Sequence, residues 1–315
     1  MEQLQFQKAI EEFQQLFISN SLRYYTEADI HVVFFRILEK ELSSRNLLLF
    51  DGDRQSVLHR EYPTFNRLLK YKHVLKAKSG FGGLYVPQRE IKGNEDWEEK
   101  SKRQSRGAFD IAIWDSSQSW LLSELKDGSR SKQNTNKCHF KELNNKMVPY
   151  NPVKYAFELK FNKLGKELFR EMYNDFYKLS LKNGRDNEED ILEGYLIYTI
   201  RKSPIETSKF TRESYQWSSH FLSDESYFLS KLRDISIGKN MNLYLKTNFT
   251  LDAQIKSSGT KTESKNRALA DEIVKKMQMV GEDSMEDNPQ KRINIVVIVS
   301  TTVDCQLTDA DSNSK

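Results

Sequence analysis

The sequence has little cysteine and no long apolar run. Only two of its 315 residues are cysteine, Cys138 and Cys305, and they form no CxxC pair. We therefore expect no structural zinc site. We expect a cytoplasmic protein whose cysteines are reduced. No stretch approaches the roughly 20 apolar residues that span a membrane. The opening residues MEQLQFQKAIEEFQQLF lack the basic start and apolar core of a signal peptide. We predict a cytoplasmic protein without membrane contact.

Two further absences narrow the function. The glycine run SGFGG at 79–83 lacks the Gly-Lys-Ser/Thr ending of a phosphate-binding loop, so we interpret it as a flexible turn. The chain also has no internal repeat and no long low-complexity linker. What is present is 37% hydrophobic residues, well supplied with Phe and Tyr, beside 30% charged residues. This composition is typical of a folded chain with one large domain or two small ones.

Periodicity predicts that helices and strands alternate along the chain. Thr26 is a candidate cap for a helix whose apolar stripe follows it, and Pro63 is expected to end a strand. The expected helices are 1–17, 26–42 and 164–181, with helical stretches near 212–235 and 262–280. The expected strands are 56–62, 109–115, 152–161, 194–200 and 293–300, and a disordered tail is expected from 303.

The segment PVKYAFELKF at 152–161 places two charges in an apolar run. In a strand its side chains alternate between faces. One face is then wholly apolar, and Glu158 and Lys160 share the other, roughly 7 Å apart along the strand. Burying two charges is costly unless they pair or bind something. Two interpretations stay open at this point: a surface ion pair on a solvent-facing edge strand, or half of a metal site.

A second acid has the same setting in the strand FDIAIWD. Asp110 lies on the face that also carries Ala112 and Trp114, as Glu158 lies beside Ala156. If the two strands are neighbours, two carboxylates and one ammonium converge. Two carboxylates suit a hard cation such as Mg²⁺ or Mn²⁺. A lysine beside it can orient a water and neutralise charge on a phosphoryl oxygen.

This arrangement resembles the PD-(D/E)xK nuclease superfamily, whose core runs helix–strand–strand–strand–helix–strand with Asp on the second strand and Glu-x-Lys on the third. The match is Asp110 and then Glu158-Leu159-Lys160, although Phe109 stands where the family name has proline. The resemblance covers roughly 20–200. It implies an α/β, restriction-endonuclease-like fold with a mixed central sheet flanked by helices. We expect a core at 1–200, a C-terminal extension at 201–302 packed on it, and a tail at 303–315.

The resemblance also implies a set of roles. Asp110 and Glu158 would hold Mg²⁺, with Mn²⁺ as a substitute, and the Leu159 carbonyl would be a further ligand. Lys160 would position the attacking water. Members often add an acid from the first helix or first strand. Glu61 is the expected fourth catalytic residue, whereas Glu27 is equally explained as a first-turn acid favoured by the helix dipole.

A second Glu-x-Lys competes with the first. Glu124-Leu125-Lys126 lies only 14 residues after Asp110, whereas the later pair requires an insertion between the two strands. The later pair is favoured because its strand alternates completely and is followed by an amphipathic helix and an apolar strand. Residues 117–127 instead predict a short helix, capped by Ser117 and ended by Gly128.

The basic residues are concentrated in two stretches. Residues 60–106 hold 12 Lys and Arg against six acids, and 116–151 is also basic. We take Lys132, Lys137 and Lys141 as candidates for gripping phosphates, against the alternative of a solvated loop.

The overall hypothesis is a Mg²⁺-dependent endonuclease acting on DNA rather than RNA, in a bacterial defence, restriction or mobile-element system. The preference for DNA and the biological role follow from the resemblance. The alternative is a non-catalytic module of the same fold that binds nucleic acid or protein within a larger complex. A protein partner or a second copy of the chain fits either hypothesis.

Overall fold

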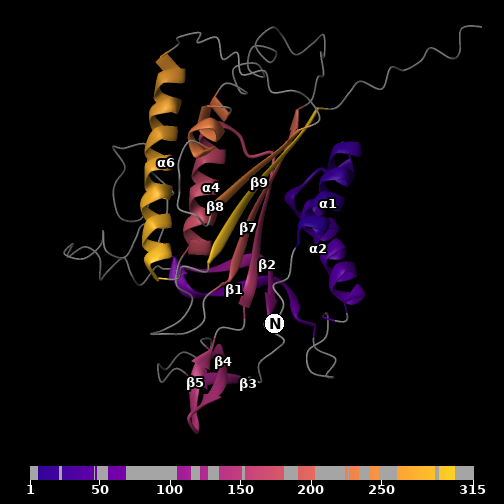
Figure 1. The fold of residues 1–315 in the computed structure, drawn as a ribbon, viewed down its shortest axis with the longest axis vertical. Coiled ribbons are helices and arrows are strands. Elements are labelled where there is room, and N and C mark those ends of the chain that lie inside the picture. Colours follow the sequence, from indigo (N-terminus) through magenta and orange to yellow (C-terminus); the bar gives the residue numbers. More distant parts are fainter. Residues whose placement is uncertain are drawn as a thin grey trace, which may run out of the picture.

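The computed structural model of the chain describes residues 6–20, 23–45, 47, 56–68, 105–114, 121–126, 135–150, 153–180, 191–202, 224–225, 227–233, 241–247, 261–287 and 291–301. A mixed sheet stands at the centre, with helices on both of its faces (Figure 1). The protein is therefore a mixed α/β protein, as the sequence predicts. Among the described residues, no helix combines the length and the apolar character that crossing a membrane requires.

The central sheet has six strands in the order β1-β2-β6-β7-β9-β8. The strands are β1 (Leu58–Leu68), β2 (Ser105–Trp114), β6 (Val153–Phe161), β7 (Glu193–Lys202), β8 (Met241–Thr247) and β9 (Arg292–Thr301). β1, β2 and β6 pair antiparallel, whereas β6, β7, β9 and β8 pair parallel. The strands predicted at 109–115, 152–161, 194–200 and 293–300 are confirmed as β2, β6, β7 and β9.

Within the described residues, α1 (Gln7–Ser19), α2 (Glu27–Ser44), α4 (Gly165–Ser180) and α6 (Lys261–Asp287) flank the sheet. α1 and α2 lie on one face, and α4 and α6 on the other (Figure 1). Thr26 caps α2 as predicted. Its hydroxyl accepts from the Asp29 amide at 3.3 Å, and the Asp29 carboxylate accepts from the Thr26 amide at 2.8 Å. This reciprocal capping box fixes where α2 begins.

The apolar face of β6 packs against α1 and α2. Phe157 contacts the Phe34 ring of α2 at 5.4 Å and the Phe6 ring at 5.3 Å. The polar face of β6 is buried as well, because β6 lies between β2 and β7 and faces α4. Glu158 is 0% exposed. The alternative of a solvent-facing edge strand is therefore wrong.

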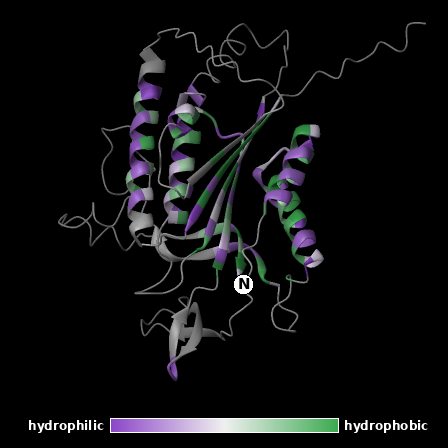
Figure 2. Cartoon of the chain, in the orientation of Figure 1, coloured by the Kyte–Doolittle hydropathy of each residue, from purple (hydrophilic) through white to green (hydrophobic). Residues whose placement is uncertain are grey.

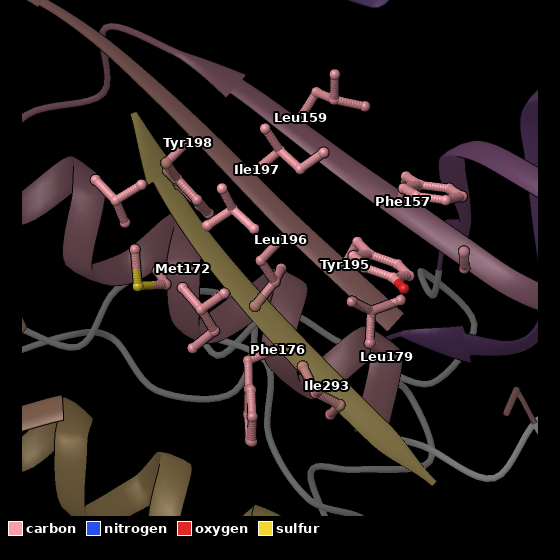
Figure 3. Packing of buried hydrophobic residues seen from close by; sticks show 14 of the residues in the cluster. Phe157, Leu159, Met172, Phe176, Leu179, Tyr195, Leu196, Ile197, Tyr198 and Ile293 are labelled. Carbon is pink, nitrogen blue, oxygen red and sulfur yellow. The ribbon is translucent and has the colours of Figure 1, made fainter. Parts of the chain in front are cut away.

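On the opposite face of the sheet, α4 packs closely against β7. Figure 3 shows Met172, Phe176 and Leu179 of α4 beside Leu196 of β7. The contact is tight at Gly194, where an added Cβ would lie 3.0 Å from Leu179 Cδ1. In Figure 2 apolar residues run along the central strands, while each covering helix carries both hydrophobic and hydrophilic residues. This packing sets how close α4 side chains come to the sheet.

The C-terminal third of the chain completes the same sheet. β9 pairs with β7 from Glu193 opposite Arg292 to Lys202 opposite Thr301. Its other edge pairs with β8, and α6 lies beside α4 (Figure 1). The described elements beyond residue 200 thus include two strands of the central sheet and a helix that lies beside α4.

Two local predictions are wrong. β1 does not end at Pro63 but continues to Leu68, with Pro63 opposite Ala108. It tolerates proline because it is an edge strand, where a missing amide donor need not break a ladder. Residues 121–126 form strand β3 rather than a helix, and pair with β4 (Thr135–Leu143), which pairs with β5 (Lys146–Tyr150). This second sheet lies below the central one in Figure 1. The predicted glycine turn at 79–83 and the tail from 303 lie outside the described residues.

Candidate active site

Asp110 stands where two neighbouring strands separate. The paired stretch of β2 and β6 runs from Trp114 opposite Val153 to Ile111 opposite Phe157. Beyond it β2 continues along β1 and β6 continues along β7. In this fork the Asp110 carboxylate takes over the bonding role of a backbone carbonyl, because Leu159 N–H donates to Asp110 Oδ2 at 2.7 Å. The fork therefore brings the acid of the second strand onto the Glu-x-Lys segment of the third.

The Lys160 ammonium lies in the middle of this fork. Its nitrogen is 3.4 Å from Asp110 Oδ2, 3.9 Å from Glu158 Oε2 and 3.2 Å from its neighbour's carbonyl, Leu159 O. Because Asp110 Oδ2 and Glu158 Oε2 both lie within 4 Å of Lys160 Nζ, these two carboxylate oxygens are less than about 8 Å apart. The three residues predicted from sequence, Asp110, Glu158 and Lys160, thus occupy one cluster.

Helix α4 contributes two charged residues that the sequence reasoning missed. Lys178 Nζ lies 2.6 Å from Glu158 Oε2 and donates to the Ala108 carbonyl at 2.9 Å. Asp175 Oδ2 lies 3.6 Å from Lys160 Nζ and accepts a hydrogen bond from the Tyr198 hydroxyl at 2.9 Å. The sequence did carry a signal, because Asp175 falls at i+3 from Met172 and i−4 from Leu179, within the apolar stripe.

The first turns of α2 supply two more residues. Glu27 Oε1 is 3.7 Å from Lys160 Nζ. His31, one turn later, places Nε2 3.3 Å from the Leu159 carbonyl and 3.6 Å from Asp110 Oδ2. The side chains of Glu27 and Asp110 are 35% and 18% exposed, whereas that of Glu158 is fully buried. The cluster is therefore reached from solvent along the side that Glu27 and Asp110 line.

Negative charge exceeds positive charge in this cluster. Four carboxyl groups surround the two ammonium groups: Glu27, Asp110, Glu158 and Asp175. Burial raises the pKa of Glu158 well above its ordinary value, with Lys178 opposing the rise and Asp110 adding to it. Burial lowers the pKa of Lys160, but Asp175, Asp110 and Glu158 outweigh it, so the net change is upward. The carboxylates likewise outweigh burial at Lys178 and raise its pKa to about 12. Both lysines are therefore cationic.

The donor chemistry of the cluster fits a hard divalent cation. Its oxygens are carboxylates and one backbone carbonyl, which are the ligands of Mg²⁺ and Mn²⁺. Neither carboxylate oxygen of Glu158 accepts a hydrogen bond of good geometry, although the Lys178 ammonium touches one of them. As the side chains stand, no three His, Cys, Asp or Glu residues within the described ranges converge closely enough to coordinate an ion. The Lys160 ammonium lies between the Asp110 and Glu158 carboxylates.

Other predicted site residues lie elsewhere. Glu61 is exposed and adopts a left-handed backbone at φ 49°. Within the described part of the chain, no ion pair or hydrogen bond links its carboxylate to the cluster, whereas Glu27 has such a contact. The rival Glu124 and Lys126 belong to β3 of the second sheet. Lys132 lies outside the described residues, and only the backbone is described at Lys137 and Lys141, in β4.

Comparison with known proteins gives no match. No protein-family model fits the sequence, and no similar curated protein or solved structure is found. The chemistry of the cluster therefore has to be argued from its own residues.

Proposed function

We propose that this chain is a metal-dependent nuclease of the PD-(D/E)xK type with a restriction-endonuclease-like core. The observation that carries the proposal is the fork itself, where Asp110, Glu158 and the Leu159 carbonyl surround the Lys160 ammonium. Apart from β3, β4 and β5, which are inserted between β2 and β6, the elements follow in the order α2-β1-β2-β6-α4-β7, and this supports the proposal because it is the helix–strand–strand–strand–helix–strand succession of that superfamily. Glu158 is fully buried, which a surface ion pair between Glu158 and Lys160 would not explain.

Two groups of residues have different roles. One group would hold the cation, and the other positions the attacking water or the Glu158 carboxylate. Asp110, Glu158 and the Leu159 carbonyl would hold Mg²⁺ or Mn²⁺, which would polarise a phosphoryl oxygen and lower the pKa of a bound water. Lys160 orients the attacking water and neutralises charge that develops on the phosphoryl group. Lys178 holds the Glu158 carboxylate in place from behind, because its ammonium is itself anchored on the Ala108 carbonyl of β2.

The substrate we propose is DNA, with cleavage at internal phosphodiester bonds and a role in bacterial defence, restriction or mobile-element biology. Support for a polyanionic partner comes from the two basic stretches, at 60–106 and 116–151. Within the second stretch, β3, β4 and β5 form a sheet rather than an open loop, which gives lysines in β4 a fixed backbone. A non-catalytic module of the same fold remains the alternative to test.

The test compares the parent chain with Asp110→Asn. Plasmid and oligonucleotide substrates are incubated with Mg²⁺, Mn²⁺ or EDTA, and cleavage is followed on gels. The parent should cleave only with a cation. The variant should lose at least about 100-fold in rate, because a cation's charge stabilisation amounts to several kcal/mol. The asparagine oxygen can still accept from Leu159 N–H, so the fold should persist.

The matched control for this test is Asp271→Asn. Asp271 lies on α6, away from the fork, where it accepts a hydrogen bond from the Tyr227 hydroxyl, and its variant should keep full activity. Cleavage that survives EDTA, or an active Asp110→Asn chain, would rule out the metal mechanism. A parent that binds nucleic acid but does not cleave it would favour the binding module.

A further inference from the structure

We propose that Lys160 is a two-position lysine. Without a divalent cation its ammonium fills the cation's own place among the oxygens, and the side chain leaves that place when a cation binds. The inference rests on the proposed metal-dependent function and deepens it, because it concerns what keeps the site filled and what must move before the reaction.

The two buried lysines are held in different ways. In a charge-assisted hydrogen bond, the ammonium nitrogen lies about 2.7–2.9 Å from the carboxylate oxygen. Lys178 meets this description, with Glu158 at 2.6 Å and the Ala108 carbonyl at 2.9 Å. Lys160 does not, because its five oxygen neighbours all lie between 3.2 and 3.9 Å and come from five residues: Glu27, Asp110, Glu158, Leu159 and Asp175. Lys160 is therefore centred in an oxygen cage rather than bonded to one partner.

The cage and the proposed ligand set share three residues. Asp110, Glu158 and Leu159 would each need an oxygen about 2.1 Å from a Mg²⁺ ion, and their oxygens now surround Lys160 Nζ. Two cations cannot share that centre. The fully buried Glu158 supports an absent ligand independently, since its Oε1 accepts no hydrogen bond from the described residues. A divalent cation bound at Oε1 would give this oxygen a partner, whereas the Lys160 ammonium lies 3.9 Å from the other oxygen, Oε2.

Among the described residues, the α2 side offers Lys160 more room to move than the α4 side. On the α4 side, Asp175 is backed by the Tyr198 hydroxyl and by Lys178, which repels a second ammonium. On the α2 side stands Glu27, whose side chain is 35% exposed and whose Oε1 lies 3.7 Å from Lys160 Nζ. Lys160 therefore moves toward Glu27, at the solvent-facing rim. There its ammonium meets an incoming phosphate instead of the metal ligands.

The first experiment measures Mn²⁺ affinity by titration calorimetry in Lys160→Met and in the matched control Lys163→Met. Lys163 lies three residues later, is 30% exposed and pairs with Glu167 at 2.8 Å, so its variant removes the same charge outside the cage. Lys160→Met should bind Mn²⁺ at least about tenfold more tightly than the parent. Lys163→Met should change the affinity by less than about twofold, as for an exposed ion pair. Equal or weaker binding by Lys160→Met would overturn the proposal.

The second experiment uses the unmodified chain, so it decides the matter even if Lys160→Met fails to fold. An amine-reactive reagent is applied with and without Mn²⁺, and labelled lysines are located by mass spectrometry. Labelling of Lys160 should rise with Mn²⁺, while that of Lys178, equally buried at 8% exposure, should not. If Mn²⁺ binds the parent and Lys160 labelling is unchanged, this inference fails and the nuclease proposal stands. If the parent does not bind Mn²⁺ at all, both fail.

Discussion

Asp175 occupies a helical position that an apolar residue ordinarily fills. Its neighbours on the stripe, Met172 and Leu179, pack against the sheet, and it is itself only 4% exposed. Burial of this acid is tolerated because Tyr198 donates to it and two ammonium groups lie within 4 Å. The cluster of Asp110, Glu158 and Lys160 could be predicted because each residue lies on the polar face of a strongly alternating strand, and the two strands, β2 and β6, are neighbours. The place of Asp175 in the apolar stripe indicated burial but not its partners. Lys178 could not be assigned from sequence, because a lysine on a helix is usually solvated and only packing shows otherwise.

Glu225 offers a prediction about pH and stability. It is 3% exposed, and its Oε1 accepts the Gly165 amide at 2.6 Å, at the start of α4. Burial raises the pKa of Glu225 to about 8, with its own and the Gly165 amides opposing and Asp224 adding to the rise. Between its ordinary pKa and about 8 the folded state holds a proton that the unfolded state has lost. Stability therefore falls as pH rises through that window.

Glu225→Gln should remove this loss of stability at rising pH. Relative to the parent, the variant should gain roughly 2–4 kcal/mol in unfolding free energy between pH 5 and pH 8. Urea unfolding at several pH values measures the difference. Glu282→Gln, at an exposed site on α6, is the control and should follow the parent. Identical pH profiles for parent and Glu225→Gln would show that the buried carboxyl does not titrate in this range.

At the scale of elements, the strands and helices with strong periodicity were predictable to within a few residues. The failures have a common cause. LLSELK at 121–126 has apolar residues at helical spacing, but pairing with β4 makes it a strand, and its partner starts nine residues after β3 ends. Similarly, Pro63 is a breaker by its local chemistry, and only its position on an edge strand permits β1 to continue. Local signals carry no information about which strand becomes a neighbour.

The contact between α4 and β7 gives the element-scale prediction. A Cβ at Gly194 would lie 3.0–3.3 Å from three Leu179 atoms, so Gly194→Ala should cost about 1–3 kcal/mol through overpacking. Thermal or urea unfolding measures this cost. In Gly194→Ala/Leu179→Ala the added methyl partly fills the space that Leu179 leaves. The double variant should therefore be more stable than the sum of the single changes predicts. A Gly194→Ala chain as stable as the parent would mean that α4 shifts without penalty.

The whole molecule is organised around a sheet whose inner strands come from distant parts of the chain. β9, near the C-terminus, lies between β7 and β8, so residues beyond 200 supply an interior strand and not only an edge. The sequence indicated a buried strand at 293–300 but not its place, because strand order depends on long-range pairing. The boundary expected near residue 200 thus runs between two hydrogen-bonded strands, β7 and β9.

Deleting residues 203–315 tests this organisation. The shortened chain loses all pairing along one edge of β7, as well as α6, which packs beside α4. It should not unfold cooperatively and should be digested rapidly by proteases. A chain that lacks only 303–315 keeps every described element and is the control. Cooperative unfolding of the 1–202 chain would show that the first 200 residues fold as a unit of their own.

The bond between Leu159 N–H and the Asp110 carboxylate couples a backbone amide to the chemistry of the fork. Elsewhere in a sheet an amide proton senses another peptide group, whose charge never changes. This one senses a side chain that can bind a ligand or be replaced by mutation. Its chemical shift and its exchange with solvent become an intrinsic spectroscopic reporter, readable by NMR in the unmodified chain. The Leu159 amide is therefore a built-in probe that lies one hydrogen bond away from the Asp110 carboxylate.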